Sequence, residues 1–245
     1  DLILENDPQI TDKLSIFGRI SDLVLAEIGD RASVLHYDSR GHGKSSRDVS
    51  TPFTPDLFAH DLAQLMDHVG WPSAVVAGCS MGGNVSQSFG KLYPSRAQGL
   101  GLLNTTAYYG SPESWEERAD TARTKGLATM IPMQIQRWVT EGFATANGSL
   151  LDRISSVFAA NDVDCYAAAC ALLANVDQRS NMGQLTMPVT IIVGDGDAAT
   201  PVAMSEQLHA GIPGSKLVIL NGRHLTPIER PAEVAAELLE LARRA

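Results

Sequence analysis

One serine in the chain has the neighbours of a catalytic nucleophile. Ser80 is the centre of a G-x-S-x-G pattern that spans residues 78–82, directly after the apolar, β-branched run Ser73–Ala77 and before a helix-compatible stretch at 83–93. A serine in a tight turn between a strand and a helix is lifted to the end of the strand, above the N-terminus of the helix. We therefore predict that Ser80 is a nucleophile and that the N–H of Met81 faces an oxyanion beside it.

A serine hydroxyl is a weak nucleophile at neutral pH, so it needs a general base that is held by a third group. Asp197 and His224 each lie a few residues beyond a predicted strand, at 188–193 and 216–220. Because parallel strands end at one edge of their sheet, we expect both side chains to lie on the same edge as Ser80. Spacing alone leaves Asp195 as an alternative to Asp197. The other histidines lie in predicted helices, a strand or a glycine-rich turn, and we interpret them as structural: His36, His42, His60, His68 and His209.

The rest of the chain alternates between short apolar runs and helical patterns. Strands are predicted at 2–4, 33–37, 73–77, 99–103, 188–193 and 216–220, and helices at 16–28, 55–69, 83–93, 204–210 and 232–243. From residue 110 to 184 the alternation stops, and helices are predicted instead at 112–125, 128–139 and 151–176. The pattern predicts an α/β fold with a mostly parallel, doubly wound sheet. Its core would comprise residues 1–109 and 185–245, and residues 110–184 would form an inserted helical lid.

Composition excludes several other classes of protein. The 245 residues carry a formal net charge of −9, which argues against a nucleic-acid binder. No run of about 18 apolar residues predicts a membrane span, and no signal peptide opens the chain. Three cysteines are too few for a disulfide framework, so we expect a reducing, cytoplasmic location. No cluster of residues has metal-ligand spacing, so we expect no metal and no cofactor. The expected partner is a small-molecule substrate, and a homo-oligomer remains an open alternative.

Several segments resemble known hydrolases. The Ser80 turn and the residues around Asp197 and His224 resemble the α/β-hydrolase superfamily, whose acid pattern G-x-x-D-x-x-x-P fits residues 194–201 and selects Asp197. Further segments are similar to 3-oxoadipate enol-lactonases of aromatic-acid catabolism: Val34–Ser45, Asn104–Ala107, Pro112–Arg118, Gln136–Val139, Tyr166–Leu172 and Gly222–Pro231. The resemblance implies a hydrolase that acts on ester bonds.

The same resemblance implies roles for further residues. A second oxyanion donor would come from the loop at 5–11, where an ungapped comparison puts Pro8, which has no N–H, so we expect Gln9 to donate instead. The usual N-terminal β-hairpin is absent from the pattern, and we expect that an N-terminal piece was removed or never existed. Arg137 is the predicted partner of a substrate carboxylate, with a solvated surface charge as the equal alternative. Trp138 and Tyr108 would line the pocket, unless they belong to the core of the lid.

Three functions fit these residues. The first is a serine hydrolase that acts on a small lactone or carboxylic ester, above all an enol-lactone with a carboxylate, through an acyl-enzyme on Ser80. The second is a biosynthetic enzyme of the same fold that performs lactone formation, C–C cleavage or rearrangement, which the unusual loop favours modestly. The third is a non-catalytic ligand-binding protein, since a fold does not fix a function. The complete set of Ser80, Asp197 and His224 argues against the third.

Overall fold

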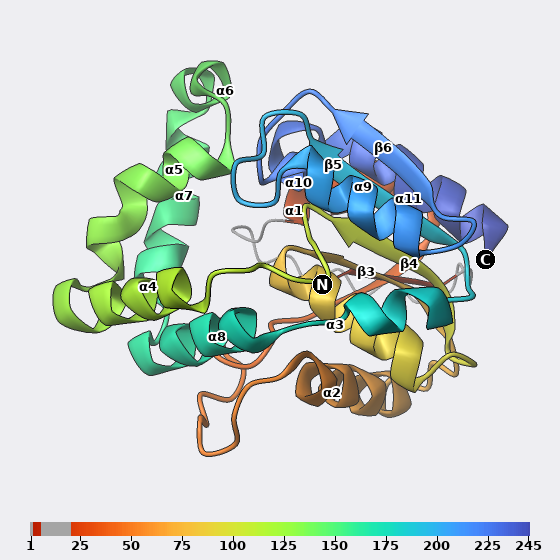
Figure 1. The fold of residues 1–245 in the computed structure, drawn as a ribbon. Helices are drawn as coiled ribbons and strands as arrows, with labels where there is room; N and C mark the ends of the chain where they lie inside the picture. The colour runs from red at the N-terminus through yellow and green to blue at the C-terminus, as the bar shows by residue number, and fades with distance from the viewer. Residues whose placement is uncertain (1, 6–20) are drawn as a thin grey trace.

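A twisted sheet forms the centre of the molecule (Figure 1). The computed structural model describes residues 21–245 and the backbone of residues 2–5. Within them the sheet has the strand order β2-β1-β3-β4-β5-β6. Its strands are β1 (Leu2–Glu5), β2 (Ser33–His36), β3 (Ala74–Cys79), β4 (Ala97–Leu103), β5 (Val189–Gly194) and β6 (Lys216–Leu220). All six predicted strands are present, and β3 to β6 are parallel, as the alternation predicts.

Strand β1 is the antiparallel exception in the mostly parallel sheet that the sequence predicts. Leu2 pairs with Ala77 and Leu4 with Val75 in an antiparallel register, so the carboxyl end of β1 lies beside the amino end of β3. The pairing with β2 is antiparallel as well. Both kinds of ladder satisfy the backbone of a short apolar strand, so the sequence pattern alone cannot set its direction. The strand that we expected to lead toward Ser80 therefore ends at the opposite edge of the sheet.

Helices cover both faces of the sheet. One face carries α2 (Pro55–His68), α3 (Met81–Leu92) and α9 (Val202–Gly211), and the other carries α1 (Asp22–Ile28) and α11 (Pro231–Arg244). Helix α1 starts at Asp22 rather than at residue 16, and residues 16–20 lie outside the described part of the chain. Thr54 caps α2, because its side chain accepts a hydrogen bond from the N–H of Leu57.

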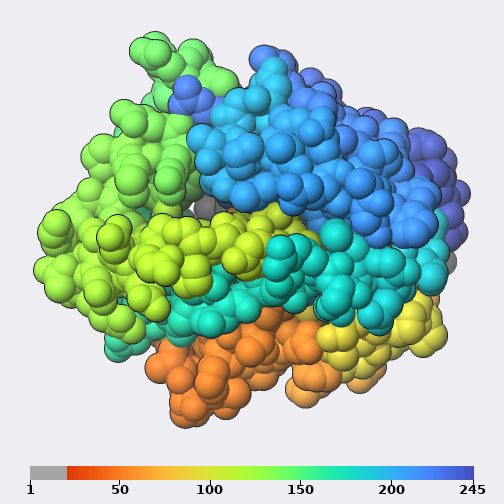
Figure 2. Space-filling view, viewed as in Figure 1, coloured from red at the N-terminus to blue at the C-terminus, as the bar shows by residue number. Residues whose placement is uncertain are grey.

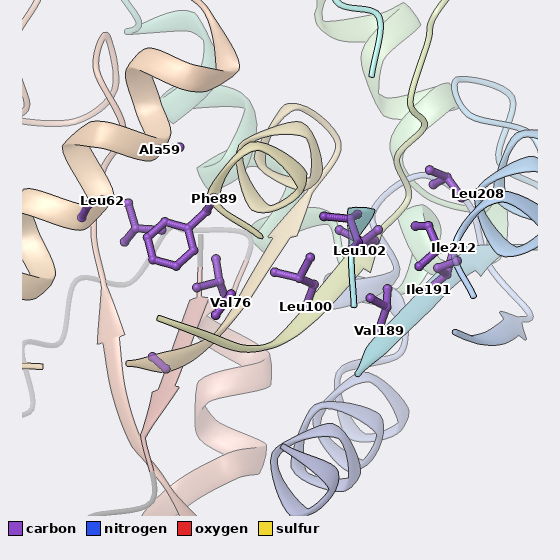
Figure 3. Close-up of a cluster of buried hydrophobic side chains, with 14 of the residues drawn as sticks. Ala59, Leu62, Val76, Phe89, Leu100, Leu102, Val189, Ile191, Leu208 and Ile212 are labelled. Carbon is purple, nitrogen blue, oxygen red and sulfur yellow. The ribbon is translucent and has the colours of Figure 1, made fainter. Parts of the chain in front are cut away.

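Alternating strand residues fill the two cores. Val76 lies near Leu62 of α2 and Phe89 of α3, and Ile191 lies near Leu208 of α9, as Figure 3 shows, whereas Ile192 packs toward α1 and α11. Successive side chains of a strand point to opposite faces, so each buried strand contributes to both clusters. This two-sided burial makes the strands apolar throughout and holds their carboxyl ends in fixed positions.

The connection from β4 to β5 is helical, as predicted. It contains α4 (Pro112–Lys125), a 3₁₀ turn (Leu127–Met130), α5 (Ile131–Trp138), α6 (Glu141–Ala146), α7 (Gly148–Ala159) and α8 (Val163–Asn175), followed by a second 3₁₀ turn (Arg179–Gln184). The short α6 was not predicted. The structure does not test the boundaries 110 and 184 of the proposed lid, which stay a prediction. In the space-filling view the surface is hollowed between the first, green part of this connection and the blue C-terminal part of the chain (Figure 2).

The single helix predicted at 151–176 is wrong. The chain forms two helices there, α7 and α8, which are bent by 92° with respect to each other. The bend follows from a helix start at Asp162, whose side chain accepts a hydrogen bond of 3.0 Å from the N–H of Cys165. No single helix among the described residues has the length and apolar composition to cross a membrane, and α7 and α8 meet that criterion only together, as this bent pair.

Candidate active site

Ser80 lies in a strained turn between β3 and α3. Its φ of 57° is in the left-handed region, which residues other than glycine seldom adopt. The turn is tight because a Cβ atom at Gly78 would come within 2.2 Å of the backbone carbonyl of Gly82. Helix α3 starts directly at Met81, two residues before the predicted start. The local sequence thus produces the half-buried, strained position that the pattern predicts for a nucleophile.

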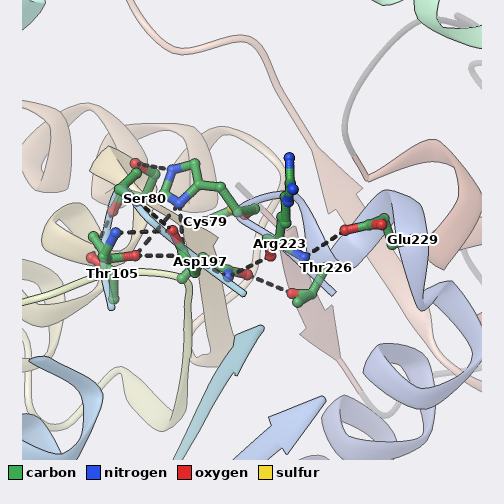
Figure 4. Close-up of polar contacts among 11 residues, drawn as sticks. Cys79, Ser80, Thr105, Asp197, Arg223, Thr226 and Glu229 are labelled. Carbon is green, nitrogen blue, oxygen red and sulfur yellow. Dashed lines mark hydrogen bonds and ion pairs between the residues drawn. The ribbon is translucent and has the colours of Figure 1, made fainter. Parts of the chain in front are cut away.

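A chain of hydrogen bonds connects the three predicted catalytic residues. The Ser80 hydroxyl is 3.0 Å from Nε2 of His224. Nδ1 of the same ring is 2.9 Å from Oδ2 of Asp197, and Figure 4 shows the two contacts. His224 is 8% and Asp197 4% exposed, so water is largely excluded from the ring–carboxylate contact. This geometry allows His224 to remove a proton from Ser80 while Asp197 fixes the orientation of the ring.

The Asp197 carboxylate is surrounded by donors. Oδ1 accepts hydrogen bonds from the N–H groups of Ala199 and Thr200, at 2.8 and 2.9 Å. Oδ2 accepts from the Thr200 hydroxyl at 2.8 Å and from the side-chain amide of Asn104 at 2.9 Å. Burial by itself would raise the pKa of this carboxyl, but the hydrogen bond and charge of His224, together with the other donors, outweigh it and lower the pKa. Asp197 therefore stays ionised and can stabilise a protonated histidine.

Asp195, the alternative acid, has a structural position. Its carboxylate accepts hydrogen bonds from the N–H of Gly222 and the side-chain amide of Asn221, both at 3.1 Å. These contacts pin the turn that precedes His224. The structure thus selects Asp197 as the partner of the histidine.

Sequence reasoning missed the supporting role of Asn104 and its neighbours. Asn104 directly follows β4, and its φ of 45° turns the chain into the site. Its amide donates to Asp197, and its side-chain oxygen accepts a hydrogen bond from Thr226. The signal that could have revealed it is a polar residue directly after a buried strand, at the edge where the strands of Asp197 and His224 also end.

The loop that carries His224 is attached to α5. The N–H of His224 lies 3.3 Å from the backbone carbonyl oxygen of Arg137, and the N–H of Leu225 lies 2.9 Å from that of Trp138. The predicted site residues 137 and 138 are therefore neighbours of the base through their backbone. The helical connection and the histidine loop form one hydrogen-bonded unit.

Glu229 strengthens this attachment. One of its carboxylate oxygens accepts hydrogen bonds from the N–H and the hydroxyl of Thr140, at 2.8 and 2.7 Å, and the other accepts from the N–H of Arg223 at 2.6 Å. Thr140 is the N-cap of α6, and Arg223 precedes the base. A single half-buried carboxylate thus joins the helical connection to the loop of His224.

The structure describes one of the two predicted oxyanion donors, Met81, but not the other, Gln9. The N–H of Met81 is the first of α3 and has no hydrogen-bond partner among the described residues, which leaves it available to a negative oxygen. Gln9 and Pro8 lie outside the described residues, so a donor from that loop stays a prediction. Because β1 is antiparallel, its last residue Glu5 lies at the edge away from Ser80.

The three predicted pocket residues, Arg137, Trp138 and Tyr108, lie in different surroundings. Arg137 is half-buried, and its guanidinium has no hydrogen-bond or ion-pair partner within the described chain. Trp138 packs edge-to-face on Phe158, with ring centroids 5.4 Å apart. Tyr108 is 37% exposed, and its ring lies 4.1 Å below the guanidinium of Arg179. Tyr108 therefore contacts a surface ion pair.

The other histidines are not part of this hydrogen-bond chain. Several contact backbone or hydroxyl oxygens of nearby residues: His36, His42, His60 and His209. His68 is exposed at the end of α2. In the part of the chain that the structure describes, no group of three or more His, Cys, Asp or Glu side chains has the arrangement of a metal site.

A serine, an acid and a histidine that follow parallel strands in this chain order are the arrangement typical of a hydrolase of the α/β type. The sequence profile of the alpha/beta hydrolase fold family matches residues 20–231, and the chain belongs to this family. A 3-oxoadipate enol-lactonase of Acinetobacter baylyi is 33% identical over 207 residues, which cover 84% of this chain and 77% of that enzyme.

Solved structures show the same relationship. The enol-lactonase from Burkholderia xenovorans LB400 superposes with a TM-score of 0.86 at 29% identity, and the match covers 91% of this chain and 85% of the other. A thermophilic esterase from Thermogutta terrifontis gives a TM-score of 0.83 at 28% identity, with coverages of 91% and 84%. The chain is a hydrolase with the α/β-hydrolase fold, similar to enzymes named as lactonases and esterases.

Proposed function

We propose that the protein is a serine hydrolase of small lactones or carboxylic esters, and that an enol-lactone with a carboxylate is its substrate class. The observation that carries this proposal is the hydrogen-bond chain from Ser80 through His224 to the ionised Asp197. The similarity to proteins named enol-lactonases supports the substrate class. Residues 110–184 are the proposed lid over the site.

In the first half of the reaction Ser80 is acylated. His224 takes the hydroxyl proton as the serine oxygen attacks the lactone carbonyl, and the negative charge of the tetrahedral intermediate develops on the carbonyl oxygen. The carbonyl then re-forms, the ring C–O bond breaks, and the ring oxygen leaves as an enolate. An enolate is a good leaving group and takes the proton from His224, which leaves His224 neutral for the second half of the reaction. The product stays attached to Ser80 as an ester.

In the second half water releases the product. His224 accepts a proton from the water as its oxygen attacks the ester on Ser80. The tetrahedral intermediate collapses, the bond to the serine oxygen breaks, and His224 returns the proton to Ser80. The balance is one lactone and one water converted to one ring-opened acid. The ionised Asp197 stabilises the imidazolium in both halves.

Arg137 is our proposed partner for a substrate carboxylate. Its backbone oxygen is hydrogen-bonded to the N–H of His224, and its guanidinium is left without an ion-pair partner among the described residues. A planar guanidinium can bind a carboxylate through two parallel hydrogen bonds. This position would orient an anionic substrate relative to the base.

A reducing, cytoplasmic compartment is part of the proposal. Cys79, Cys165 and Cys170 are all free, and the latter two are buried within α8. Free cysteines without disulfides support a reducing location.

The decisive experiment combines labelling with activity. We expect a fluorophosphonate to modify the wild type once, at Ser80, and not to modify the variant S80A. We expect the wild type, but not S80A, to hydrolyse members of a panel of lactones and esters. A folded wild type that is neither labelled nor active would refute the proposal and favour a ligand-binding protein. Labelling without hydrolysis, but with lactone formation or C–C cleavage in the same panel, would favour the biosynthetic alternative.

The role of Arg137 has a separate test. We expect R137A to raise KM for carboxylate-bearing esters about tenfold or more, since removal of one charged hydrogen-bond partner costs roughly 1.5–3 kcal/mol. Neutral esters of the same size should keep their KM. Arg153, an exposed arginine of α7, provides the matched control R153A, which should change neither. An equal effect of R137A on neutral and anionic esters would show that Arg137 does not bind the carboxylate.

A further inference from the structure

The side chain of Tyr109 has an unused hydrogen-bond donor. Its hydroxyl oxygen is buried and has no hydrogen-bond partner among the described residues. Its ring packs edge-to-face on Trp115, with centroids 5.6 Å apart, in a cluster that also contains Met81. An unsatisfied hydroxyl in the interior is unfavourable, so a buried donor of this kind requires an explanation.

This hydroxyl lies in the neighbourhood of the nucleophile, because the Tyr109 ring shares a cluster with Met81, the residue that follows Ser80. Burial raises the pKa of the Tyr109 phenol strongly, and the nearby hydroxyls of Thr105 and Ser80 lower it in part. The negative charge of Asp197 acts in the same direction as burial. The phenol therefore keeps its proton in the pH range in which a histidine acts as a base, and beside Ser80 it serves as a donor.

No hydrogen bond of acceptable geometry joins the Tyr109 hydroxyl to either neighbouring hydroxyl, and the protons of both neighbours are donated elsewhere. The Ser80 hydroxyl is paired with His224 at 3.0 Å, and the Thr105 hydroxyl donates to the backbone carbonyl of Ser80 at 2.7 Å. The Tyr109 proton therefore lies beside the reacting oxygen and lacks an acceptor with good geometry. A substrate carbonyl that bonds to Ser80 would bring such an acceptor.

The site also needs a donor of this kind. Among the described residues, the N–H groups of Met81 and Gly82 at the start of α3 have no hydrogen-bond partner, and that of Met81 directly follows Ser80 in the chain. Strand β1, which was expected to lead into the second donor, ends at the far edge of the sheet. One donor alone would leave the oxyanion half satisfied in a buried environment.

We propose that the Tyr109 hydroxyl is an oxyanion donor, which hydrogen-bonds to the substrate oxygen that becomes negative when Ser80 adds to the carbonyl. The proton stays on Tyr109 throughout, so no bond is made or broken at this residue. The hydrogen bond is weak to the neutral carbonyl and strengthens as charge develops, which lowers the barrier without tightening substrate binding. This inference rests on the proposed serine-hydrolase function.

The variant Y109F tests the proposal, because it keeps the ring on Trp115 and removes only the hydroxyl. With an ester that the wild type hydrolyses, we expect kcat to fall on the order of 10²-fold and KM to change little, as for the loss of one oxyanion donor. The rate of Ser80 labelling by a fluorophosphonate should fall as well, since that reaction also places charge on an oxygen beside the serine. The matched control Y93F removes the hydroxyl of a tyrosine at the far end of α3, which contacts His60, and should retain wild-type rates.

Each outcome decides the question. A kcat within twofold of wild type, or an effect confined to KM, would overturn the role of Tyr109. The thermal midpoint of Y109F should equal or exceed that of wild type, because an unsatisfied buried group is removed. A clear fall in that midpoint would assign the hydroxyl a structural role and overturn the proposal too. If the wild type itself is neither labelled nor active, the proposed function fails; if the wild type is labelled and Y109F is labelled equally fast, only this inference fails.

Discussion

The variant T200V measures how much the hydrogen bond from the Thr200 hydroxyl stabilises the ionised carboxylate of Asp197. The Thr200 hydroxyl donates to the carboxylate at 2.8 Å, and the residue is fully buried. Valine has nearly the same shape and lacks the donor. Thr226 offers a matched control, because it is equally buried and its hydroxyl donates to the neutral side chain of Asn104 instead.

We expect T200V to destabilise the protein more than T226V does. A hydrogen bond to an ionised group contributes about 1.5–3 kcal/mol, whereas one between neutral groups contributes about 1 kcal/mol. At roughly 2–4 °C per kcal/mol for a chain of this size, T200V should lower the thermal midpoint by about 3–12 °C. The same scale gives about 2–4 °C for T226V. Urea unfolding at pH 7 provides the free energies directly.

The pH dependence separates the two variants more sharply. The pKa of Asp197 is lowered in the folded protein, so its ionised form stabilises the fold above the ordinary aspartate pKa of about 3.9. This contribution disappears as the pH falls through the lowered value. T200V removes part of that contribution, so the gap between T200V and wild type should be widest at neutral pH and should narrow below about pH 3.9. The gap for T226V should stay constant. Equal losses for both variants at every pH would refute the conclusion that Thr200 supports a charge.

Two further substitutions test the positions that hold the site together. G78A should reduce the yield of folded protein or destabilise it by more than about 3 kcal/mol, because the new methyl group meets the backbone of Gly82 at 2.2 Å. The control G148A, at a glycine with open space around it, should be tolerated. Soluble yield and thermal midpoint compare the two variants. E229Q should lower the free energy of unfolding by about 1–3 kcal/mol and lower kcat, because it weakens the attachment of the histidine loop. Thermal unfolding and initial rates measure the two effects. The control E233Q, at an exposed ion pair, should change stability by less than about 1 kcal/mol.

The sequence was sufficient for the elements that carry the three catalytic candidates. Ser80, Asp197 and His224 each follow a short apolar run, and the end of a buried strand is a local feature that residue types reveal. Their common location follows from the topology of parallel sheets. Whether they act as catalysts remains a proposal, but their meeting at one edge could be predicted before any coordinates were known.

Other features depend on contacts that no local pattern encodes. The direction of β1 is set by its partners in the sheet, and a four-residue apolar run is compatible with both directions. The break between α7 and α8 arises at Asp162, which is an ordinary polar residue in a helical pattern until its side chain caps α8. The attachment of His224 to the backbone of Arg137 joins residues 87 positions apart, a pairing that periodicity cannot reveal.

An isolated β-bridge fixes the orientation of the two adjacent tyrosines, Tyr108 and Tyr109. Tyr108 pairs with Asp177 in an isolated antiparallel bridge, and in such extended backbone successive side chains point to opposite sides. Asp177 also holds Arg179 in an ion pair at 2.6 Å, and that guanidinium covers the ring of Tyr108. With Tyr108 held at the surface, Tyr109 turns inward, where its ring joins the cluster of Trp115 and Met81 and its hydroxyl is buried. The bridge at Asp177 therefore determines which of two chemically identical side chains can reach the nucleophile, and the exposed ion pair contributes to the site by fixing the orientation of Tyr109.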